Sequence, residues 1–402
     1  MKNATERWPS IATLAMAAAI SPLAMNVYLP SLPSIADHFQ TSAATAQLSV
    51  SLFLAATAAM QLIFGPMSDK YGRRPIMLIL LCVMLMATLV CIYAINIEMF
   101  LVGRFLQASA AVGIVLSRAI VRDRYQGSEA ASKIAYVTMG MTLAPMIGPA
   151  LGGLLQDSFG WQASFWLVFC FTAIAVTVIW FDLNETNRFK GGTFFNQFRS
   201  FPEIIKSRRF WGYSATCAFS SGAFFAFLGG GPLLAIEYYG LKPTAFGFHF
   251  IFIAVGYLIG NFMAGRLSVY FGLNRMMMIG NLVVLFGLTL ALVLTANFRD
   301  NAFAFFALIF FVGLGNGITL PNANAGIVAV RPKIAGAASG LGATLQIGGG
   351  AIIAAITGYY ISFSEGPQYL LSVMIFTIIC AIASTLYVLH IDKVRKLEST
   401  RD

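Results

Sequence analysis

Charged side chains are scarce in this sequence. Only 10% of the 402 residues are Asp, Glu, Lys or Arg, whereas 58% are apolar, and the mean hydropathy is +0.78. So few polar side chains cannot cover the surface of a water-soluble protein of this length. The composition therefore excludes a soluble globular protein and indicates an integral membrane protein.

Cysteine and histidine are also rare, with five and three residues. All five cysteines lie in apolar runs without the spacing of a metal site, so neither a disulfide scaffold nor a zinc site is indicated. The chain also has no His/carboxylate cluster of metal spacing and no nucleophile beside a base, which disfavours a membrane enzyme. We expect no cofactor and no bound metal.

Long apolar runs, in contrast, are abundant. A membrane-spanning helix needs about 20 apolar residues. The sequence therefore predicts an all-α integral membrane protein, and an even number of spans places both termini on the same side. Twelve candidate spans are present, at residues 11–34, 44–66, 75–95, 99–120, 133–156, 163–182, 210–235, 245–266, 275–296, 302–324, 336–361 and 368–390.

The positions of Lys and Arg test this topology. All but Arg104, Lys242 and Arg299 fall at the ends of the spans that share a side with the termini, and such an excess marks the cytoplasmic side. The net charge of +10 is thereby explained by membrane orientation, and no nucleic-acid partner is expected. We interpret the first apolar run as an uncleaved helix, because eleven further spans follow it.

A dense cluster of glycine and charge separates the second and third spans. We predict that residues 65–74 form a short aqueous loop, in which Gly72 adopts a positive φ and Gly65 allows a close helix contact. Asp69 is expected to be the counter-charge of the neighbouring cations. The pattern is Gly-x-x-x-Asp-x-x-Gly-Arg-Arg, and the candidate gating residues are Gly65, Asp69, Gly72, Arg73 and Arg74.

This pattern resembles the signature loop between helices two and three of the major facilitator superfamily of transporters. The resemblance implies two pseudo-symmetric six-helix bundles, and it implies that Asp69, Arg73 and Arg74 latch the cytoplasmic gate. An internal repeat supports the duplication, because Gly265 and Gly272 follow Gly65 and Gly72 by 200 positions.

The first span contains a Tyr-Leu-Pro-x-Leu-Pro string that begins at Tyr28. This string is similar to the first helix of the Bcr/CflA group of drug exporters within the superfamily. Asn26 stands where that group has an Asp, which would be the natural protonation site. The two prolines are equally consistent with simple packing and with a binding site, because membrane helices tolerate broken backbone where it faces protein or a cavity.

The fourth span carries Arg104 and Gln107, similar to the Arg-x-x-Gln-Gly element of the superfamily, with Ala108 in place of Gly. A buried Arg costs several kcal/mol unless it faces a polar interior, so Arg104 is a candidate binding residue. The alternative is an Arg that holds helices together through a backbone carbonyl. Arg118 lies on the same helix face, or else extends to the cytoplasmic surface.

The fifth span is rich in glycine and proline and looks like the element of the antiporter branch of the superfamily. Glycines four positions apart permit close helix contact, and prolines bend the helix. The resemblance implies export by exchange, and small-residue packing explains the same pattern. The residues concerned are Pro145, Gly148, Pro149, Gly152 and Gly153.

No acidic residue falls near the middle of a predicted span. Exporters of lipophilic cations need a buried carboxylate, which attracts the cation and exchanges it for a proton. We therefore expect a preference for neutral, zwitterionic or anionic small molecules. Asp37 and His249 are the remaining titratable candidates for proton coupling, although His249 is equally consistent with helix packing.

Further residues could line a transport pathway in the second half. The amides among them are also consistent with hydrogen bonds between helices. The aromatic pair lies beside Gly222 and could form the wall of an apolar cavity. These candidates are Phe224, Phe225, Asn322 and Gln346.

The expected organisation is a bundle at 1–182, a cytoplasmic linker with an interfacial amphipathic helix at 183–209, a bundle at 210–390 and a tail at 391–402. The family implies proton-coupled efflux of drugs or drug-like metabolites by alternating access in a bacterial inner membrane. A dedicated siderophore or metallophore exporter, a nutrient importer of the same fold and a sensor are alternatives. The expected partners are a small-molecule substrate, a coupling proton and the lipid bilayer, and we expect a monomer.

Overall fold

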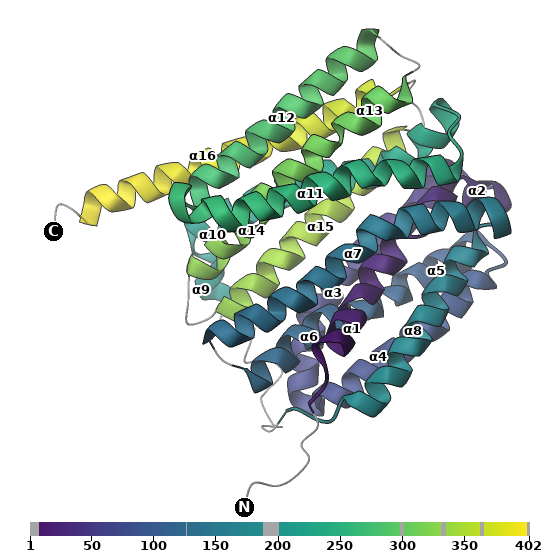
Figure 1. Cartoon of the computed structure of the whole chain (residues 1–402), viewed down its shortest axis with the longest axis horizontal. Helices are drawn as coiled ribbons and strands as arrows, with labels where there is room; N and C mark the ends of the chain where they lie inside the picture. The colour runs from purple at the N-terminus through teal and green to yellow at the C-terminus, as the bar shows by residue number, and fades with distance from the viewer. Residues whose placement is uncertain are drawn as a thin grey trace, which may run out of the picture. The chain divides into compact units, whose positions relative to one another are not determined.

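The computed structural model describes residues 8–125, 127–187, 201–297, 301–330, 335–361 and 366–399, and these residues are almost entirely helical (Figure 1). Eleven helices in the described residues are long and apolar enough to span a membrane. The remaining predicted span lies in α7 (Gly127–Phe159), a helix of 33 residues. The prediction of an all-α membrane protein with twelve spans is confirmed.

The chain divides into two compact units. Unit 1 consists of the described residues of Met1–Asn196 and Lys242–Gly247, and unit 2 consists of those of Gln197–Leu241 and Phe248–Asp402. Within unit 1, α1 packs against α6, α7 and α8, and α3 packs against α5 and α6. Besides α7, its helices are α1 (Ile11–Asn26), η1 (Leu29–Ser31), α2 (Leu32–His38), α3 (Ala43–Tyr71), α4 (Arg73–Ile92), α5 (Ile97–Gln107), η2 (Ala108–Ala110), α6 (Ala111–Arg124) and α8 (Gln162–Asp182).

Within unit 2, α10 packs against α14, α15 and α16, and α12 packs against α14 and α16. Most of α11 belongs to this unit, although its first residues are part of unit 1. The elements are α9 (Phe201–Ile205), α10 (Arg208–Leu233), η4 (Leu234–Tyr238), α11 (Pro243–Phe271), α12 (Leu273–Asn297), α13 (Ala302–Leu308), α14 (Phe310–Val330), α15 (Ala335–Ile361) and α16 (Gln368–Ser399).

Polar side chains define where several helices begin. The Ser10 hydroxyl accepts a hydrogen bond from the Thr13 N–H (3.0 Å), and Ser42 does the same for Thr45 (3.1 Å). Asn96 accepts from the Met99 N–H (2.9 Å) at the start of α5. Because each cap satisfies a backbone donor that the first turn leaves open, the helices can be joined by short connections.

The internal repeat is present in the backbone. Helices α3 and α11 both have 29 residues and begin 200 positions apart. Each is followed by a single glycine with a positive φ, +104° at Gly72 and +78° at Gly272. The predicted duplication and the predicted conformation of Gly72 are therefore confirmed.

Residues 65–74 do not form a loop, because α3 continues to Tyr71 and α4 begins at Arg73, which leaves Gly72 alone outside the helices. Asp69 in the last turn of α3 pairs with Arg73, the first residue of α4, so the two charges hold the helix ends together across Gly72. Of the linker expected at 183–209 with its amphipathic helix, residues 188–200 lie outside the described residues.

Candidate functional site

Gly72 joins α3 to α4 by a conformation that suits glycine alone. Its φ of +104° and ψ of 149° lie in a region that side chains other than hydrogen rarely adopt. The Gly72 N–H donates to the Ser68 carbonyl (3.0 Å) and closes the last turn of α3. A Cβ at Gly72 would collide with the carboxylate of Glu185. The residue is therefore required for its backbone conformation, and any side chain there would displace the Glu185 carboxylate.

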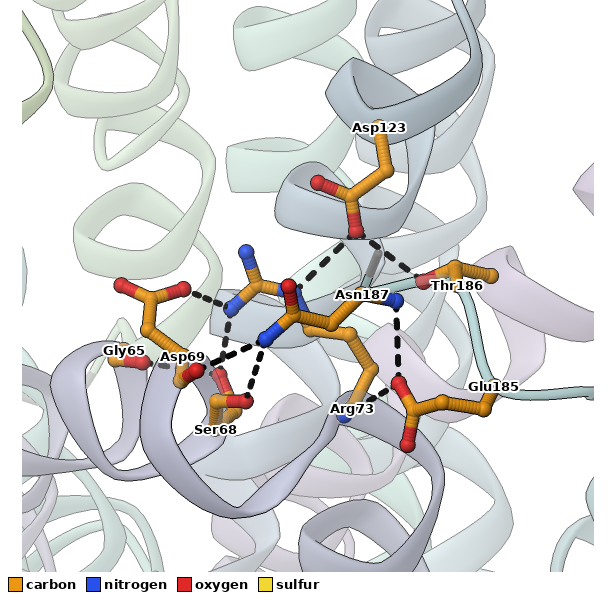
Figure 2. A network of polar contacts seen from close by, with 8 residues as sticks. All are labelled: Gly65, Ser68, Asp69, Arg73, Asp123, Glu185, Thr186 and Asn187. Atoms are coloured by element: carbon orange, nitrogen blue, oxygen red, sulfur yellow. Dashed lines mark hydrogen bonds and ion pairs between the residues drawn. The ribbon is translucent and has the colours of Figure 1, made fainter. Parts of the chain in front are cut away.

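The Arg73 guanidinium, at the start of α4, contacts both α3 and α6 (Figure 2). Its Nη1 lies 2.5 Å from Asp69 Oδ1 and donates to Ser68 Oγ at 2.6 Å. Its Nε donates to Asp123 Oδ2 at 3.2 Å, and Asp123 belongs to the last turn of α6. The Arg73 side chain is only 11% exposed. This one cation therefore holds the ends of α3, α4 and α6 together.

The residues that follow α8 complete this network. Glu185 Oε1 accepts from the Arg73 backbone N–H (2.9 Å), so a carboxylate caps the N-terminus of α4. The Thr186 hydroxyl donates to Asp123 Oδ2 (3.0 Å), and Asn187 Nδ2 donates to the Asp69 carbonyl (2.7 Å). We call residues 183–187 the post-α8 segment. Its hydrogen bonds tie the end of α8 to the ends of α3, α4 and α6 (Figure 2).

The other predicted gating residues have separate contacts. Arg74 Nη2 donates to the Trp180 carbonyl (2.9 Å), and its guanidinium lies 5.1 Å from the centre of the Trp180 ring. The Gly65 carbonyl accepts from Ser68 Oγ (2.8 Å). The structure thus brings Asp69, Gly72 and Arg73 together and places the Arg74 side chain against Trp180 of α8.

Arg104 lies in the interior of unit 1 with no solvent exposure. Its Nη1 donates to Gln107 Oε1 (2.5 Å) and to the Ala24 carbonyl (3.2 Å). The guanidinium carbon lies 4.1 Å from the centre of the Tyr28 ring and 4.6 Å from that of Phe53, so two aromatic faces stabilise the charge. No carboxylate of the described residues pairs with it.

Two nitrogens of the Arg104 guanidinium are unpaired among the described residues. Nε and Nη2 are buried and have no hydrogen-bond partner there, and the same holds for Oδ1 of Asn26. The Asn26 amide nitrogen donates to the Pro22 carbonyl of its own helix (2.7 Å). The Tyr28 hydroxyl is 3.0 Å from Ser49 Oγ. The structure brings Tyr28, Arg104 and Gln107 into contact, whereas Arg118 is half-buried on α6, beyond the turn η2.

The glycines of α7 pack against the break between α1 and η1. A Cβ at Gly148 would lie 3.4 Å from Asn26 Cβ, and a Cβ at Gly152 would collide with the Val27 carbonyl. Gly153 lies in the same way against the backbone of Pro243 and Thr244 within unit 1. Pro145 and Pro149 lie inside the helix. This element therefore sits directly against the residue that replaces the expected Asp.

The candidates from the second half are dispersed within unit 2. Gln346 Oε1 accepts a hydrogen bond from Cys217 Sγ (3.4 Å), and Asn322 Nδ2 donates to the Ile318 carbonyl of its own helix (2.7 Å). The ring of Phe225 packs on Gly350 of α15. His249 lies 4.8 Å from the Phe306 ring, and Phe224 packs beside Phe225.

Asp37 is exposed at the end of α2 in unit 1. The described residues contain no group of His, Cys, Asp and Glu that could hold a metal ion.

Sequence reasoning missed most of the partners of Arg73. Ser68, Asp123, Glu185, Thr186 and Asn187 were not candidates, although all five contribute to the network. The available signal was topological, because the ends of α3, α6 and α8 were all predicted on the same side of the membrane. An acid at the end of a neighbouring helix on that side is therefore a reasonable partner for a buried Arg.

The comparisons agree with this architecture. The sequence profile described as Major Facilitator Superfamily matches residues 14–255 and 231–401. The bicyclomycin resistance protein homolog of Haemophilus influenzae is 29% identical over 86% of this chain and 88% of its own length. A chloramphenicol resistance protein of Pseudomonas aeruginosa is 30% identical over 78% of this chain and 76% of its own. These relatives confirm the resemblance to the Bcr/CflA drug exporters.

Similarity to other transporters is more limited. The uncharacterized MFS-type transporter YdgK of Bacillus subtilis is 34% identical over 63% of this chain, and the match spans 64% of YdgK. The crystal structure of a bacterial homolog of the human lysosomal transporter Spinster, inward-facing and occupied, has a TM-score of 0.72 at 14% identity, over 95% of this chain and 96% of that one. It supports the fold alone. The chain belongs to the Major Facilitator Superfamily of membrane transporters and is not an enzyme.

Proposed function

We propose that this transporter exports drug-like small molecules from a bacterial cell by proton-coupled alternating access, with a preference for neutral, zwitterionic or anionic substrates. The names of the Haemophilus and Pseudomonas relatives support export of antibiotics. The excess of Lys and Arg supports an inner-membrane topology with cytoplasmic termini. The network around Arg73 is then the cytoplasmic latch, which must open and close as the two halves alternate.

The observation that carries the substrate preference is the unpaired charge of Arg104. The side chain is wholly buried, and no carboxylate of the described residues neutralises it. An opposite charge about 12 Å away gains roughly 1.4 kcal/mol at an effective dielectric constant of about 20, which is a tenfold difference in affinity. Arg104 therefore favours anionic groups over cationic ones through its field, without requiring direct contact.

Two features favour a functional role for Arg104 over a purely structural one. A structural Arg would be expected to use its donors, yet Nε and Nη2 have no hydrogen-bond partner among the described residues. Asn26 Oδ1, beside the α7 glycines of the same unit, likewise has no partner among them. Unpaired polar atoms in an apolar interior cost free energy. Unused donors on a buried charged side chain are consistent with a site that a substrate or water completes.

The test is accumulation of a compound panel, sorted by charge, in a bacterial host that lacks its own efflux pumps. We expect the wild-type protein to exclude anionic and zwitterionic compounds, and a protonophore to abolish the exclusion. Arg104→Gln removes the charge and should raise accumulation of anionic compounds about tenfold. Arg104→Lys keeps the charge and should retain most of the preference, although it loses the planar contact with the aromatic rings.

Folding and transport must be separated in this test. Each variant is compared at equal membrane abundance and equal melting temperature in detergent. If Arg104→Gln is folded but excludes anionic compounds as well as wild type does, Arg104 is structural and the proposed preference is wrong. If the wild-type protein increases uptake, it is an importer, and the interpretation of the α7 glycines as an antiporter element is also wrong.

The proton carrier is either Asp37 or His249 in this proposal. They lie in different units, Asp37 exposed in unit 1 and His249 against Phe306 in unit 2. Asp37→Asn and His249→Gln are assayed in proteoliposomes with an imposed pH gradient. Loss of the gradient-driven component in one variant, with exchange between two substrate pools retained, identifies the carrier. Retention of the gradient-driven component in both variants excludes both candidates.

A further inference from the structure

Unit 2 contains an open groove between its first and last long helices. Helices α10 and α16 pack against each other, and the groove between them has a volume of about 330 Å³. Its surface is formed by small residues flanked by two aromatic rings. The lining residues are Trp211, Gly212 and Ala215 of α10, and Ala383, Ser384 and Tyr387 of α16.

The shape of this groove is fixed by close contacts. Gly212 lies so near α16 that a Cβ would collide with the Val388 side chain and would reach 3.4 Å from Tyr387 Cδ1. The Trp211 indole N–H donates to the Ile205 carbonyl (2.8 Å), which fixes the orientation of the ring. The close contact at Gly212 therefore holds α10 and α16 together. The rings of Trp211 and Tyr387 form the walls of the groove.

The surface around the groove is apolar. Phe376, Ile379 and Leu386 of α16 are 65%, 52% and 54% exposed, and Trp211 and Tyr387 are 44% and 46% exposed. Both helices are candidate membrane spans. An exposed apolar surface on a membrane helix contacts lipid acyl chains, so a chain can lie in the groove without loss of apolar contact.

One end of the groove is positively charged. Arg208 lies three and four positions before Trp211 and Gly212, which places it on the same face of α10. The first turn of α10 and the far end of α16 meet there, because Arg209 Nε lies 2.8 Å from Asp392 Oδ1. Lys206 and Lys393 are exposed and lie close in sequence to Arg208 and Asp392, respectively. None of the three cations Lys206, Arg208 and Lys393 forms an ion pair with a described residue.

We propose that this groove binds one phospholipid with an anionic headgroup. The acyl chain lies between Trp211 and Tyr387, and the phosphate lies at the level of Arg208 and Lys206. Aromatic side chains are preferred at the level of the headgroups, and juxtamembrane cations attract anionic lipid. The unpaired cations at the mouth of an apolar groove are complementary to such a lipid, whereas a zwitterionic phospholipid brings no net negative charge. This proposal does not depend on the transported substrate.

The test uses fluorescence quenching by brominated phospholipids in vesicles. The chain has five tryptophans, so the signal of Trp211 is taken as the difference between wild type and Trp211→Phe. We expect dibromo-phosphatidylglycerol to quench this signal at a several-fold lower fraction of bilayer lipid than dibromo-phosphatidylcholine. Lys206→Gln with Arg208→Gln should remove the difference, since each cation near the surface changes affinity about fivefold.

Matched variants keep the test decisive. Arg275→Gln removes an exposed cation at the start of α12, outside the groove, and should leave the lipid preference intact. Ala383→Leu fills the groove and should weaken quenching by both lipids. Equal quenching by the two headgroups, or a preference that survives the double variant, would overturn the proposal. It would also be overturned if neither lipid quenched Trp211 and the protein proved to be a dimer that covers the groove.

Discussion

The α3–α4 junction of unit 1 and the α11–α12 junction of unit 2 have the same backbone design and different side chains. Each turns at one glycine with a positive φ, Gly72 or Gly272. At the first, Arg73 contacts carboxylates of α3 and α6. At the second, the matching residue is Leu273, and Val269, in the place of Asp69, is 85% exposed. The duplicated turn therefore does not require the charges, which must serve another purpose.

Unit 2 has its own polar network, which joins the ends of α10, α12 and α16. Asp392 of α16 accepts from Asn274 Nδ2 (2.7 Å) and pairs with Arg209 at the start of α10. In unit 1 the matching contact is Asp182, the last residue of α8, which accepts from the Ser10 backbone N–H (2.8 Å). Both units thus fasten their last long helix to their first. The first turn of α12 after Gly272 is also fastened, through Asn274, but among the described residues only unit 1 has an ion pair across its glycine turn.

The largest difference between the junctions should appear when each glycine becomes alanine. Gly72→Ala places a methyl group against Glu185 in a backbone conformation that suits glycine, and we expect it to lower the free energy of unfolding by about 3 kcal/mol. At Gly272 a Cβ meets nothing within 4 Å, so Gly272→Ala should cost only the backbone strain of about 1–2 kcal/mol. Denaturant titration in detergent compares them. If the two variants lose the same free energy of unfolding, the Glu185 side chain moves away from the new methyl group at no cost.

Removal of the cation should have the next largest effect. Arg73→Ala leaves Asp69 and Asp123 without their common partner, and both carboxylates are partly exposed, at 35% and 22%. Solvent screening reduces the cost of the unpaired charges, so we expect a loss of about 2 kcal/mol and a strong loss of transport. Leu273→Ala in unit 2 is the matched control for transport. If Arg73→Ala exports normally, the network is not a latch.

The comparison also shows what the sequence could predict. Apolar runs predicted the twelve spans, because spans follow from local periodicity. The charge pattern predicted Asp69 as the counter-charge of the neighbouring cations, but within a loop that the structure does not have. Asp123 lies 50 positions from Arg73, so only helix packing brings them together. Gln107 could be predicted as a partner of Arg104, because it lies three positions away on the same helix face. The Ala24 carbonyl and the Tyr28 ring could not be predicted, because only helix packing brings them to the guanidinium.

The post-α8 segment should make a smaller contribution. Glu185→Ala removes the carboxylate that caps α4, and such caps contribute about 1 kcal/mol. Glu185→Gln keeps an oxygen acceptor but loses the charge at the helix N-terminus, so it should cost less. The two variants are compared by melting temperature and by export. An effect of Glu185→Ala below that of Glu185→Gln would contradict the capping role.

The smallest effect is expected when the ion pair of unit 1 is built into unit 2. Val269→Asp with Leu273→Arg recreates the spacing of Asp69 and Arg73 across the matching glycine turn. Position 269 is exposed, and the introduced pair has no third partner like the Asp123 that contacts Arg73 in unit 1. The coupling energy of the double-mutant cycle should therefore be only about 0.3–0.5 kcal/mol. In unit 1 the cycle of Asp123→Ala and Arg73→Ala should exceed this value, because that pair joins two helices and is less exposed. If the two cycles agree, the charges of unit 1 add nothing beyond a local helix pair, and the latch must lie elsewhere.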